Sequence, residues 1–465
     1  MRALRPSPLI IALSAVLVLL TAGNAMAQYS FDWSIPKQGA VKDMLILEDF
    51  TTTFTNTSAV TDSFRVTLVK EMPPFWQATL CQGPICYPPS YTVHIFSLEP
   101  GESTNLDFAL TAALDEGKGT STVTVESLND PGLVETNYFS IISSGLEILT
   151  VDADGGAAYE SYFTNAIDAS GRTTATWTSS YMGALEGTDM ANFDAVVWFV
   201  GTNSQGLDNT DRTSLTEYVS NGGNLFLTGQ NLARDFCDPG SPLYTTETHA
   251  WFGELLGVDY LADNAASSLV NGVTGDPISD GMVLAINGGD GADNNASPDE
   301  IITSGNSVTA MTYFTGGQDA AIRAAYGEGR TFFSAFGFEG VATVGQRDDM
   351  MASVLNWITA RFTPAQDQVP IQLVSKPYVT PNPFNPRTSL KFEVGGSQAV
   401  NSEVVIYDLR GRKIRRLHSG LLSPGPQTMA WDGRDDGGRN LASGVFLARV
   451  VVGPDAQTVK MTLAR

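Results

Sequence analysis

Three prolines within six residues constrain the fold of this chain more than any other feature: Pro381-Asn382-Pro383-Phe384-Asn385-Pro386. Proline fixes φ and has no backbone N–H, so the segment is predicted to be extended and stiff, and to mark a domain boundary. The runs that follow, 389–394, 403–409 and 445–452, alternate as strands do and are separated by Gly, Asp, Asn and Arg clusters. Residues 381–465 are therefore predicted to form a small β-sandwich.

The order of short motifs in this region resembles two kinds of domain. After the hexapeptide come Tyr407-Asp408-Leu409-Arg410-Gly411-Arg412, Trp431-Asp432-Gly433-Arg434-Asp435 and Ala442-Ser443-Gly444-Val445-Phe446. This order resembles the C-terminal sorting domains of type IX secretion cargo, and equally the immunoglobulin-like domain of flagellar hook-capping (FlgD-like) proteins. The first resemblance implies secretion and sorting machinery as partners, with the hexapeptide, Gly411 and Arg412 as the sorting motif. The second implies only an architectural terminal domain, and the motifs leave both open.

The N-terminus has the features of a signal peptide. Arg2 and Arg5 precede an apolar run from Leu9 to Leu20, and Ala25-Met26-Ala27 offers a cleavage site, so residues 1–27 are predicted to be removed. The alternative is an uncleaved anchor, but the run is shorter than the ~20 residues that cross a bilayer. The sequence thus predicts a secreted or cell-surface protein that passes through the periplasm, with no transmembrane segment in the mature chain.

The charge of the chain limits the classes of partner that it is expected to bind. The formal net charge is −23, which disfavours nucleic acid because each phosphate contact would be opposed by the field of the protein. From Arg387 onward basic residues outnumber acidic ones, so a basic terminal domain follows an acidic body. That basic region could guide docking to secretion machinery or an anionic surface glycan, or could only keep a strand edge soluble.

The chain has three cysteines. Cys81 and Cys86 flank a Gly-Pro turn, and in an exported protein this spacing favours a disulfide over a metal site, which would need further ligands. Cys237 is left over between Asp235 and Asp238, whose charges would raise its pKa and disfavour a nucleophilic role.

Two further regions precede the terminal domain. Residues 28–144 contain short alternating runs spaced by turns, which predicts an immunoglobulin-like β-sandwich. Residues 145–362 alternate strands with helical segments, which predicts a flavodoxin-like α/β domain with a parallel sheet, and residues 363–380 form a linker. The expected strands of the α/β domain include 146–151, 193–200, 224–228, 308–314, 320–326 and 330–336, with helices at 159–169, 209–220 and 346–361.

The middle region resembles class I glutamine amidotransferase-like domains, through Asp194-Ala195-Val196-Val197-Trp198-Phe199 and Asn221-Gly222-Gly223-Asn224-Leu225-Phe226-Leu227-Thr228-Gly229-Gln230. The resemblance implies a catalytic cysteine on the strand-to-helix turn, but Gln230 stands there, and an amide cannot attack an acyl carbon. His249 is the nearby histidine and has no evident nucleophile to serve, so a structural role is favoured. A glutaminase mechanism is therefore excluded.

Ligands of parallel α/β sheets bind beyond the carboxyl ends of the strands, which places the candidate binding site in the loops there. The predicted ligand-binding residues are Asp152, Asp154, Gly201, Asn203, Gln230 and Asn231. If the domain is catalytic, the candidates are Asp152, His249 and Glu339. Convergence of these three side chains and Gln230 in one pocket would favour an enzyme, whereas scatter, or burial under Trp198 and Phe338, would favour binding.

An acidic loop at 288–295 resembles oxygen-rich calcium loops, with Asp290, Asp293 and Asn295 as possible ligands. Solvated turn residues explain the same composition, and no other cofactor is indicated. The sequence as a whole favours an exported binding or scaffolding protein that presents loops to a glycan or protein ligand. The alternative is an extracellular hydrolase of carbohydrate or peptide that uses the acidic strand-end loops.

Overall fold

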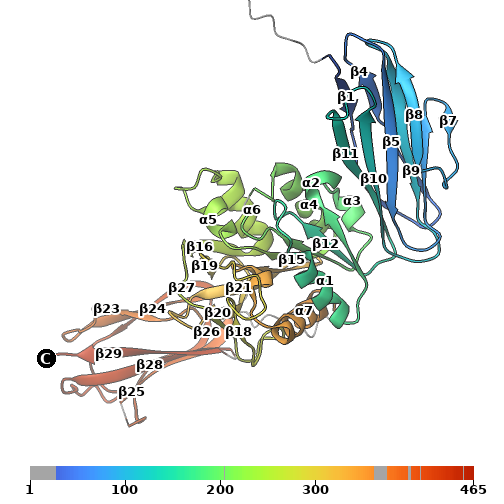
Figure 1. Cartoon of the computed structure of the whole chain (residues 1–465). Coiled ribbons are helices and arrows are strands. Elements are labelled where there is room, and N and C mark those ends of the chain that lie inside the picture. The colour runs from blue at the N-terminus through green and yellow to red at the C-terminus, as the bar shows by residue number, and fades with distance from the viewer. Residues whose placement is uncertain (1–27, 204, 361–373, 396–398, 409, 454) are drawn as a thin grey trace, which may run out of the picture. The chain divides into compact units, whose positions relative to one another are not determined.

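A computed structural model describes residues 28–203, 205–360, 374–395, 399–408, 410–453 and 455–465. The predicted signal peptide and residues 363–373 of the predicted linker lie outside the described residues. The chain divides into two compact units, Met1–Ala360 and Arg361–Arg465, and each is described by itself. Both are rich in β-strands (Figure 1). Within the described residues, no helix has the length and apolarity needed to cross a membrane.

The first part of unit one is a pair of sheets whose strands pair antiparallel, except for β2, which pairs parallel with β11. One has the order β1-β4-β9-β6-β7 with β3 paired to β9, and the other has the order β2-β11-β10-β5-β8. The strands are β1 (Phe31–Ser34), β2 (Gly39–Lys42), β3 (Leu47–Phe50), β4 (Thr53–Asn56), β5 (Asp62–Glu71), β6 (Gln77–Gln82), β7 (Ile85–Cys86), β8 (Val93–Leu98), β9 (Ser103–Thr111), β10 (Lys118–Ser127) and β11 (Val134–Ser143).

The two sheets share an aromatic core because their strands alternate inward and outward. In β5 the side chains of Phe64, Val66 and Leu68 are buried, and they join Phe54 and Phe108 in one hydrophobic cluster. This sandwich-like arrangement agrees with the expectation for residues 28–144.

Two details of this part test local predictions. The predicted disulfide between Cys81 and Cys86 is present and joins β6 to β7. The sequence also predicts a strand at Met44–Ile46, one of the short runs of residues 28–144, and this prediction is wrong: Leu45 has φ 64° and lies in the turn before β3. An apolar run is no guide to a strand where a residue adopts left-handed backbone.

The second part of unit one is built on a large mixed sheet with the order β13-β12-β14-β15-β22-β21-β20-β17-β18, joined by β16 and β19. Strands β13, β12, β14, β15 and β22 run parallel to one another. The strands are β12 (Ile148–Asp152), β13 (Thr174–Thr178), β14 (Ala195–Phe199), β15 (Asn224–Thr228), β16 (Val258–Ala262), β17 (Leu269–Gly272), β18 (Val283–Ala285), β19 (Glu300–Thr303), β20 (Val308–Tyr313), β21 (Asp319–Tyr326) and β22 (Gly329–Ser334).

The sheet is therefore mixed, and the prediction of a parallel sheet was wrong for its second half. β20, β21 and β22 pair antiparallel. Only Gly327 and Glu328 separate β21 from β22, and so short a connection allows a hairpin but no crossover helix. The strand segments themselves lie close to where the sequence placed them.

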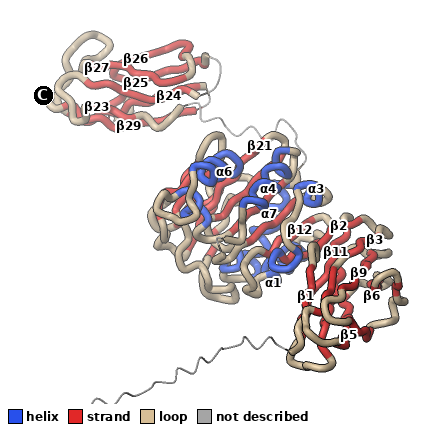
Figure 2. The backbone as a smooth tube through the Cα atoms, turned by 90° about the horizontal axis from the view of Figure 1, so that it is seen from above, coloured by secondary structure: helices blue, strands red, loops and turns tan. Residues whose placement is uncertain are grey.

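Helices cover both faces of the parallel part, as Figure 2 shows. Residues of β14 alternate between two cores: Trp198 packs with the cluster that contains Leu215 and Phe252, and Val197 with the cluster that contains Phe163. The helices are α1 (Glu160–Ala169), α2 (Ser179–Met182), α3 (Gly187–Met190), α4 (Asn209–Ser220), α5 (Leu232–Cys237), α6 (Thr246–Leu256) and α7 (Val344–Ile358), with a 3-10 turn η1 (Phe338–Gly340).

The second unit is a small sandwich of two sheets, β23-β24-β27 and β26-β25-β28-β29. Its strands are β23 (Tyr378–Thr380), β24 (Thr388–Val394), β25 (Val400–Asp408), β26 (Lys413–Leu422), β27 (Gly425–Trp431), β28 (Gly444–Val452) and β29 (Asp455–Leu463). Phe384, Trp431 and Phe446 lie in its core, with ring centroids 5.4 Å apart for Phe384–Trp431 and 5.2 Å for Trp431–Phe446.

The proline-rich hexapeptide is fastened to the last strand of this unit. The Phe384 N–H donates to the Thr462 carbonyl (3.0 Å), and the Asn382 amide oxygen accepts from the Thr462 N–H (2.8 Å). The segment consists of bends around one bridge residue, Phe384, which pairs with Leu463, so it is not the continuous extended lead-in that was predicted but an integral part of the terminal sandwich.

Candidate functional site

The candidate binding site lies where the parallel strands end. The loops after β12 and β14 lie against each other, since the Asn203 side-chain amide donates to the Ala153 carbonyl (3.0 Å). Gly201 has left-handed backbone (φ 55°), and a Cβ there would lie only 2.9 Å from the Tyr159 ring, so this position favours glycine. The structure thus brings together Asp152, Asp154, Gly201 and Asn203, four of the six predicted ligand-binding residues.

A cavity of about 330 Å³ opens between these loops and the segments that follow β13 and precede α4. Its lining includes Asp152, Asn203, Asp208 and Asp211, together with Ser179. Among the residues that the structure describes, no lysine or arginine lines it. Because three aspartates belong to its lining, the cavity suits a ligand that offers hydroxyl or other hydrogen-bond donors.

Burial changes the acidity of two of these carboxyl groups. Burial, and then the charges of Asp154 and Glu160, raise the pKa of Asp152 to about 7, against the lowering effect of the Asp154 N–H. Burial, and then the charge of Asp208, raise the pKa of Asp211 to about 6. The cavity therefore holds carboxyls that carry a proton at pH values where ordinary aspartates have lost it.

The strand-to-helix turn after β15 is occupied by two amides. The Gln230 side chain is buried, its oxygen accepts from the Ser297 N–H (2.9 Å), and its NH₂ donates to the Asn294 carbonyl. Asn231 follows in left-handed backbone, φ 68°, and begins α5. Both hydrogen-bonding atoms of Gln230 are therefore used by the protein itself, and neither amide at this turn can act as a nucleophile.

Glu339 is fully buried in the turn after β22. One of its oxygens accepts from the Asn294 side-chain amide (2.7 Å), and the other has no hydrogen-bond partner. Burial raises the pKa of Glu339, and the charge of Asp154 raises it further. The carboxyl thus belongs to an internal polar network with Gln230 and Asn294, and it does not line the cavity.

The catalytic candidates are not gathered in one pocket. Asp152 lines the strand-end cavity, whereas His249 lines a separate cavity of about 560 Å³ beside α6. Gln230 and Glu339 line neither cavity, and Trp198 and Phe338 are fully buried. This scatter is the arrangement that the sequence analysis associated with binding.

The predicted calcium loop is held by protein groups. Asp290 pairs with Arg347 (3.2 Å), and the Asp293 carboxylate accepts from the Gly288 N–H (2.9 Å). The Asn295 amide oxygen, a supposed ligand, accepts from the Gly337 N–H (2.6 Å). These contacts give the loop a structural explanation, and they carry no argument for calcium.

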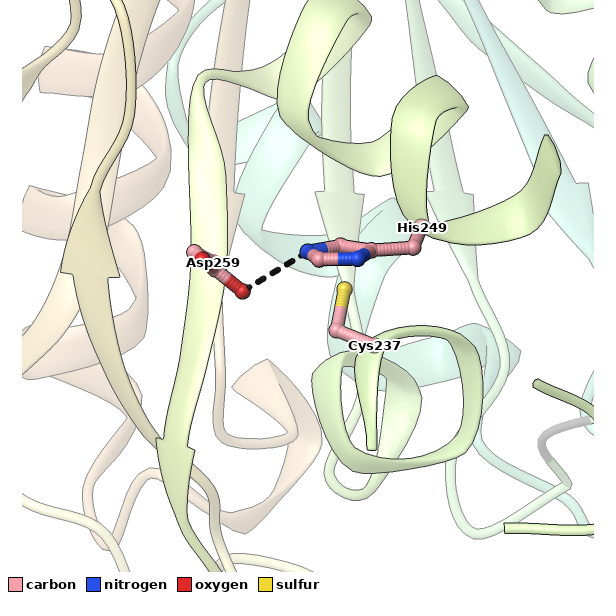
Figure 3. A group of neighbouring side chains, drawn as sticks. All are labelled: Cys237, His249 and Asp259. Atoms are coloured by element: carbon pink, nitrogen blue, oxygen red, sulfur yellow. Dashed lines mark hydrogen bonds and ion pairs between the residues drawn. The ribbon is translucent and has the colours of Figure 1, made fainter. Parts of the chain in front are cut away.

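Sequence reasoning missed one cluster. Cys237, His249 and Asp259 come together beside α6, and their ligand-type atoms all lie within 4.8 Å of one another (Figure 3). Burial, and then the charges of Asp259 and Asp299, raise the pKa of the Cys237 thiol to about 12. The prediction that the pKa of Cys237 is raised was right. Its cause was wrong, since burial contributes more than the charges of Asp235 and Asp238, its neighbours in the sequence. No spacing rule finds this cluster, because its members meet only through the packing of three elements.

Comparison with known proteins identifies the terminal unit. Residues 382–453 match the family model of the FlgD Ig-like domain. The predicted resemblance to the immunoglobulin-like domain of flagellar hook-capping proteins is thereby confirmed. The match lies outside residues 145–362, and it does not separate sorting from architecture.

No curated protein matches the chain. Among solved structures, the N-terminal domain of PorA is similar at 17% identity and TM-score 0.19, covering 24% of this chain and 97% of that one. PorZ, a type-IX secretion component of Porphyromonas gingivalis, is similar at 23% identity and TM-score 0.15, covering 19% of this chain and 11% of PorZ. Alpha-2-macroglobulin of Escherichia coli is similar at 18% identity and TM-score 0.19, covering 25% and 7%. Such low TM-scores carry no argument about this chain.

Proposed function

We propose that this chain is an exported bacterial protein of the cell surface or medium that binds a ligand without transforming it. Its C-terminal immunoglobulin-like domain delivers or anchors it through secretion and sorting machinery. Its strand-end cavity binds a neutral, hydroxyl-rich ligand, with a surface glycan as the preferred class and a protein loop as the other. The parallel part of the mixed sheet is proposed to be a glutamine amidotransferase-like scaffold that has lost its nucleophile.

The observation that carries this proposal is the turn after β15. An acyl-transfer enzyme of that scaffold needs an attacking sulfur or oxygen there. Gln230 stands there instead: its oxygen accepts a hydrogen bond from the Ser297 N–H, and its NH₂ donates one to the Asn294 carbonyl. The turn after β15 therefore has a structural role: it holds the segment before β19 in place.

The lining of the cavity supports the ligand class. Carboxyl groups accept hydrogen bonds from hydroxyls, and a carboxyl that keeps its proton, as Asp152 does at mildly acidic pH, can also donate one. An anionic ligand would meet a lining with three aspartates and, within the described part of the chain, no basic side chain. The cavity therefore favours neutral polyols over phosphorylated or sulfated compounds.

The binding proposal is tested by blocking the cavity. Ala184 lines it and is exposed, so Ala184→Trp fills the opening without disturbing the core. Calorimetry against neutral oligosaccharides from the surface of the producing cell should show binding that A184W loses. Ala266→Trp, at an exposed position outside the lining, is the matched control and should bind like the natural protein. Equal binding by A184W would overturn the proposed site.

The delivery proposal needs a variant that leaves the terminal fold intact, because the hexapeptide holds that fold together. The turn between β25 and β26 offers one: the Asp408 carboxylate accepts from the Arg412 N–H (2.9 Å) and its guanidinium (3.1 Å), while the Arg412 side chain is 77% exposed. Arg412→Ala therefore removes an exposed charge and keeps the backbone bond.

In the producing cell, a chain ending before Pro381 should accumulate in the periplasm, and R412A should be exported less efficiently than the full-length protein. Fractionation with C-terminal mass spectrometry measures both. Unaltered export of the truncated chain would refute delivery by this domain and leave it an architectural role.

A second candidate function has one observation in its favour. Asp152 and Asp211, with pKa values raised to about 7 and about 6, line the same cavity, and such carboxyl pairs serve as acid and base in glycoside hydrolysis. Turnover of oligosaccharides by the purified protein, lost in Asp152→Asn, would establish this hydrolase in place of the binding protein.

A further inference from the structure

The cluster of Cys237, His249 and Asp259 is built by three elements that pack on one another. Cys237 ends α5, His249 lies on α6, and Asp259 lies on β16. Each of these elements contacts the other two. In Figure 3 the sulfur of Cys237 and the carboxylate of Asp259 both point toward the imidazole of His249. Three side chains of different chemistry thus meet at one point.

Local structure fixes the positions of His249 and Asp259. Helix α6 begins at a capping box of Thr245 and Thr248 and ends at Gly257, whose φ of 68° turns the chain directly into β16. Two contacts orient the Asp259 side chain: its Oδ1 accepts from the Tyr260 N–H (2.8 Å) and lies 3.0 Å from the His249 Nε2. The donor atoms are therefore positioned before any ligand arrives.

We propose that Cys237, His249 and Asp259 form a zinc-binding site, distinct from the strand-end cavity. Thiolate, imidazole and carboxylate are the protein ligands that Zn²⁺ uses, at about 2.3 Å for sulfur and about 2.0–2.2 Å for nitrogen and oxygen. Two ligands of one tetrahedral zinc ion then lie about 3.3–3.8 Å apart. The three atoms here already lie within 4.8 Å of one another, so small side-chain rotations complete the geometry.

The surroundings of the cluster favour a divalent cation. Asp299 is buried close enough to act on the Cys237 thiol, and its Oδ1 has no hydrogen-bond partner among the described residues. The nearby cation Arg234 is shared between Asp235 (3.1 Å) and Asp263 (3.3 Å). A metal ion at Cys237 would place positive charge beside the unpaired oxygen of Asp299.

The site has room for a further ligand. The side chains of His249 and Asp259 are 40% and 41% exposed, and His249 also lines the cavity of about 560 Å³ with Glu254 and Tyr326. Zinc sites with three protein ligands keep water or an exogenous ligand in the remaining position. The proposed ion would therefore be accessible from solvent.

A Cys-His-Asp catalytic group is the competing interpretation of the same residues. Access to the sulfur separates the two. Cys237 is buried, so a substrate carbonyl cannot easily reach its sulfur, whereas the half-exposed side chains of His249 and Asp259 leave a path for a small ion. The geometry therefore favours metal binding.

The test uses the mature full-length protein, with reducing agent kept at a level that leaves the Cys81–Cys86 bridge closed. Titration with Zn²⁺ alone should show one site, and Co²⁺ should give the charge-transfer absorption of a thiolate ligand. Cys237→Ser, His249→Gln and Asp259→Asn should each weaken zinc binding at least ~10-fold, and C237S should abolish the thiolate band.

His418→Gln is the matched control, since His418 lies in the other unit and hydrogen-bonds only locally, to the Gly420 carbonyl. It should bind zinc like the natural protein, which separates the site from loose binding by any histidine. Thermal unfolding without metal shows whether each variant still folds, and D259N, at a half-exposed position, should unfold like the natural protein. Absence of the thiolate band, or unchanged affinity in a folded C237S or D259N, overturns the proposal.

Discussion

At the scale of single residues, the strand-end cavity is defined by carboxyl groups whose burial disfavours their charged form. Asp152 is nearly fully buried, and its pKa is raised from 3.8 to about 7. In the unfolded chain the same carboxyl loses its proton near pH 4. Between those two pH values the folded state binds more protons than the unfolded state, so the free energy of unfolding decreases as pH rises.

Asp152→Asn should remove that dependence. The Asn amide keeps an oxygen for the Asp154 N–H, which donates to Asp152 over 3.2 Å, and it has no charge to bury. A shift of three pK units corresponds to at most on the order of 4 kcal/mol, part of it shared with Asp154 and Glu160. Urea unfolding at about pH 4 and about pH 8 should therefore show D152N gaining stability relative to the natural protein as pH rises. Parallel pH profiles for the two proteins would contradict the raised pKa.

At the scale of elements, the cavity exists because the loop after β14 closes on the loop after β12. Gly206 makes that closure possible: a Cβ there would lie 2.0 Å from the carbonyl oxygen of Ala153, and backbone cannot yield as a flexible side chain does. Gly206→Ala should cost about 1–3 kcal/mol of unfolding free energy, as overpacking does. Chemical denaturation measures the loss.

Gly345→Ala is the control for that substitution. Gly345 lies exposed in α7, and a Cβ there meets nothing within 4 Å. Alanine is a better helix former than glycine, so G345A should match the natural protein or exceed it by up to about 1 kcal/mol. If both variants lost equal stability, the close approach of the two loops would not be the cause.

The sequence predicts helices and strands correctly where local signals determine them. Helix α4 spans Asn209–Ser220 as expected, because Asp208 and Asp211 form a capping box at its start. The antiparallel half of the large sheet was missed, although the two-residue link between β21 and β22 contained the information. Of the site, Asp152 and Asn203 could be foreseen, since strand ends determine them.

The cluster of Cys237, His249 and Asp259 could not be foreseen, because it depends on how α5, α6 and β16 pack. Its members follow no metal-binding spacing, and each one, taken singly, has an ordinary structural explanation. Packing geometry is set by all the apolar contacts of a domain together, and a motif does not encode it.

At the scale of the whole molecule, the two compact units have separate cores. The core of the terminal unit contains Phe384, Trp431 and Phe446. Among the described residues, it has no member before Val374, and the three cores of the first unit have none after Ile358. A unit that buries its own apolar residues has the main driving force for folding by itself. Its stability should then depend little on the rest of the chain.

Separate expression of residues 28–360 and 374–465 tests this independence. Calorimetry of the shorter piece should show one cooperative transition, with an enthalpy on the order of 60 kcal/mol for a domain of its size. Its midpoint should lie within a few degrees of the corresponding transition in the full-length protein, and the sum of the two thermograms should reproduce the full one. Because the hexapeptide fastens to β29, a still shorter piece that starts after Pro386 should lose that transition. A piece 374–465 without a cooperative transition would show that the terminal unit needs the rest of the chain to fold.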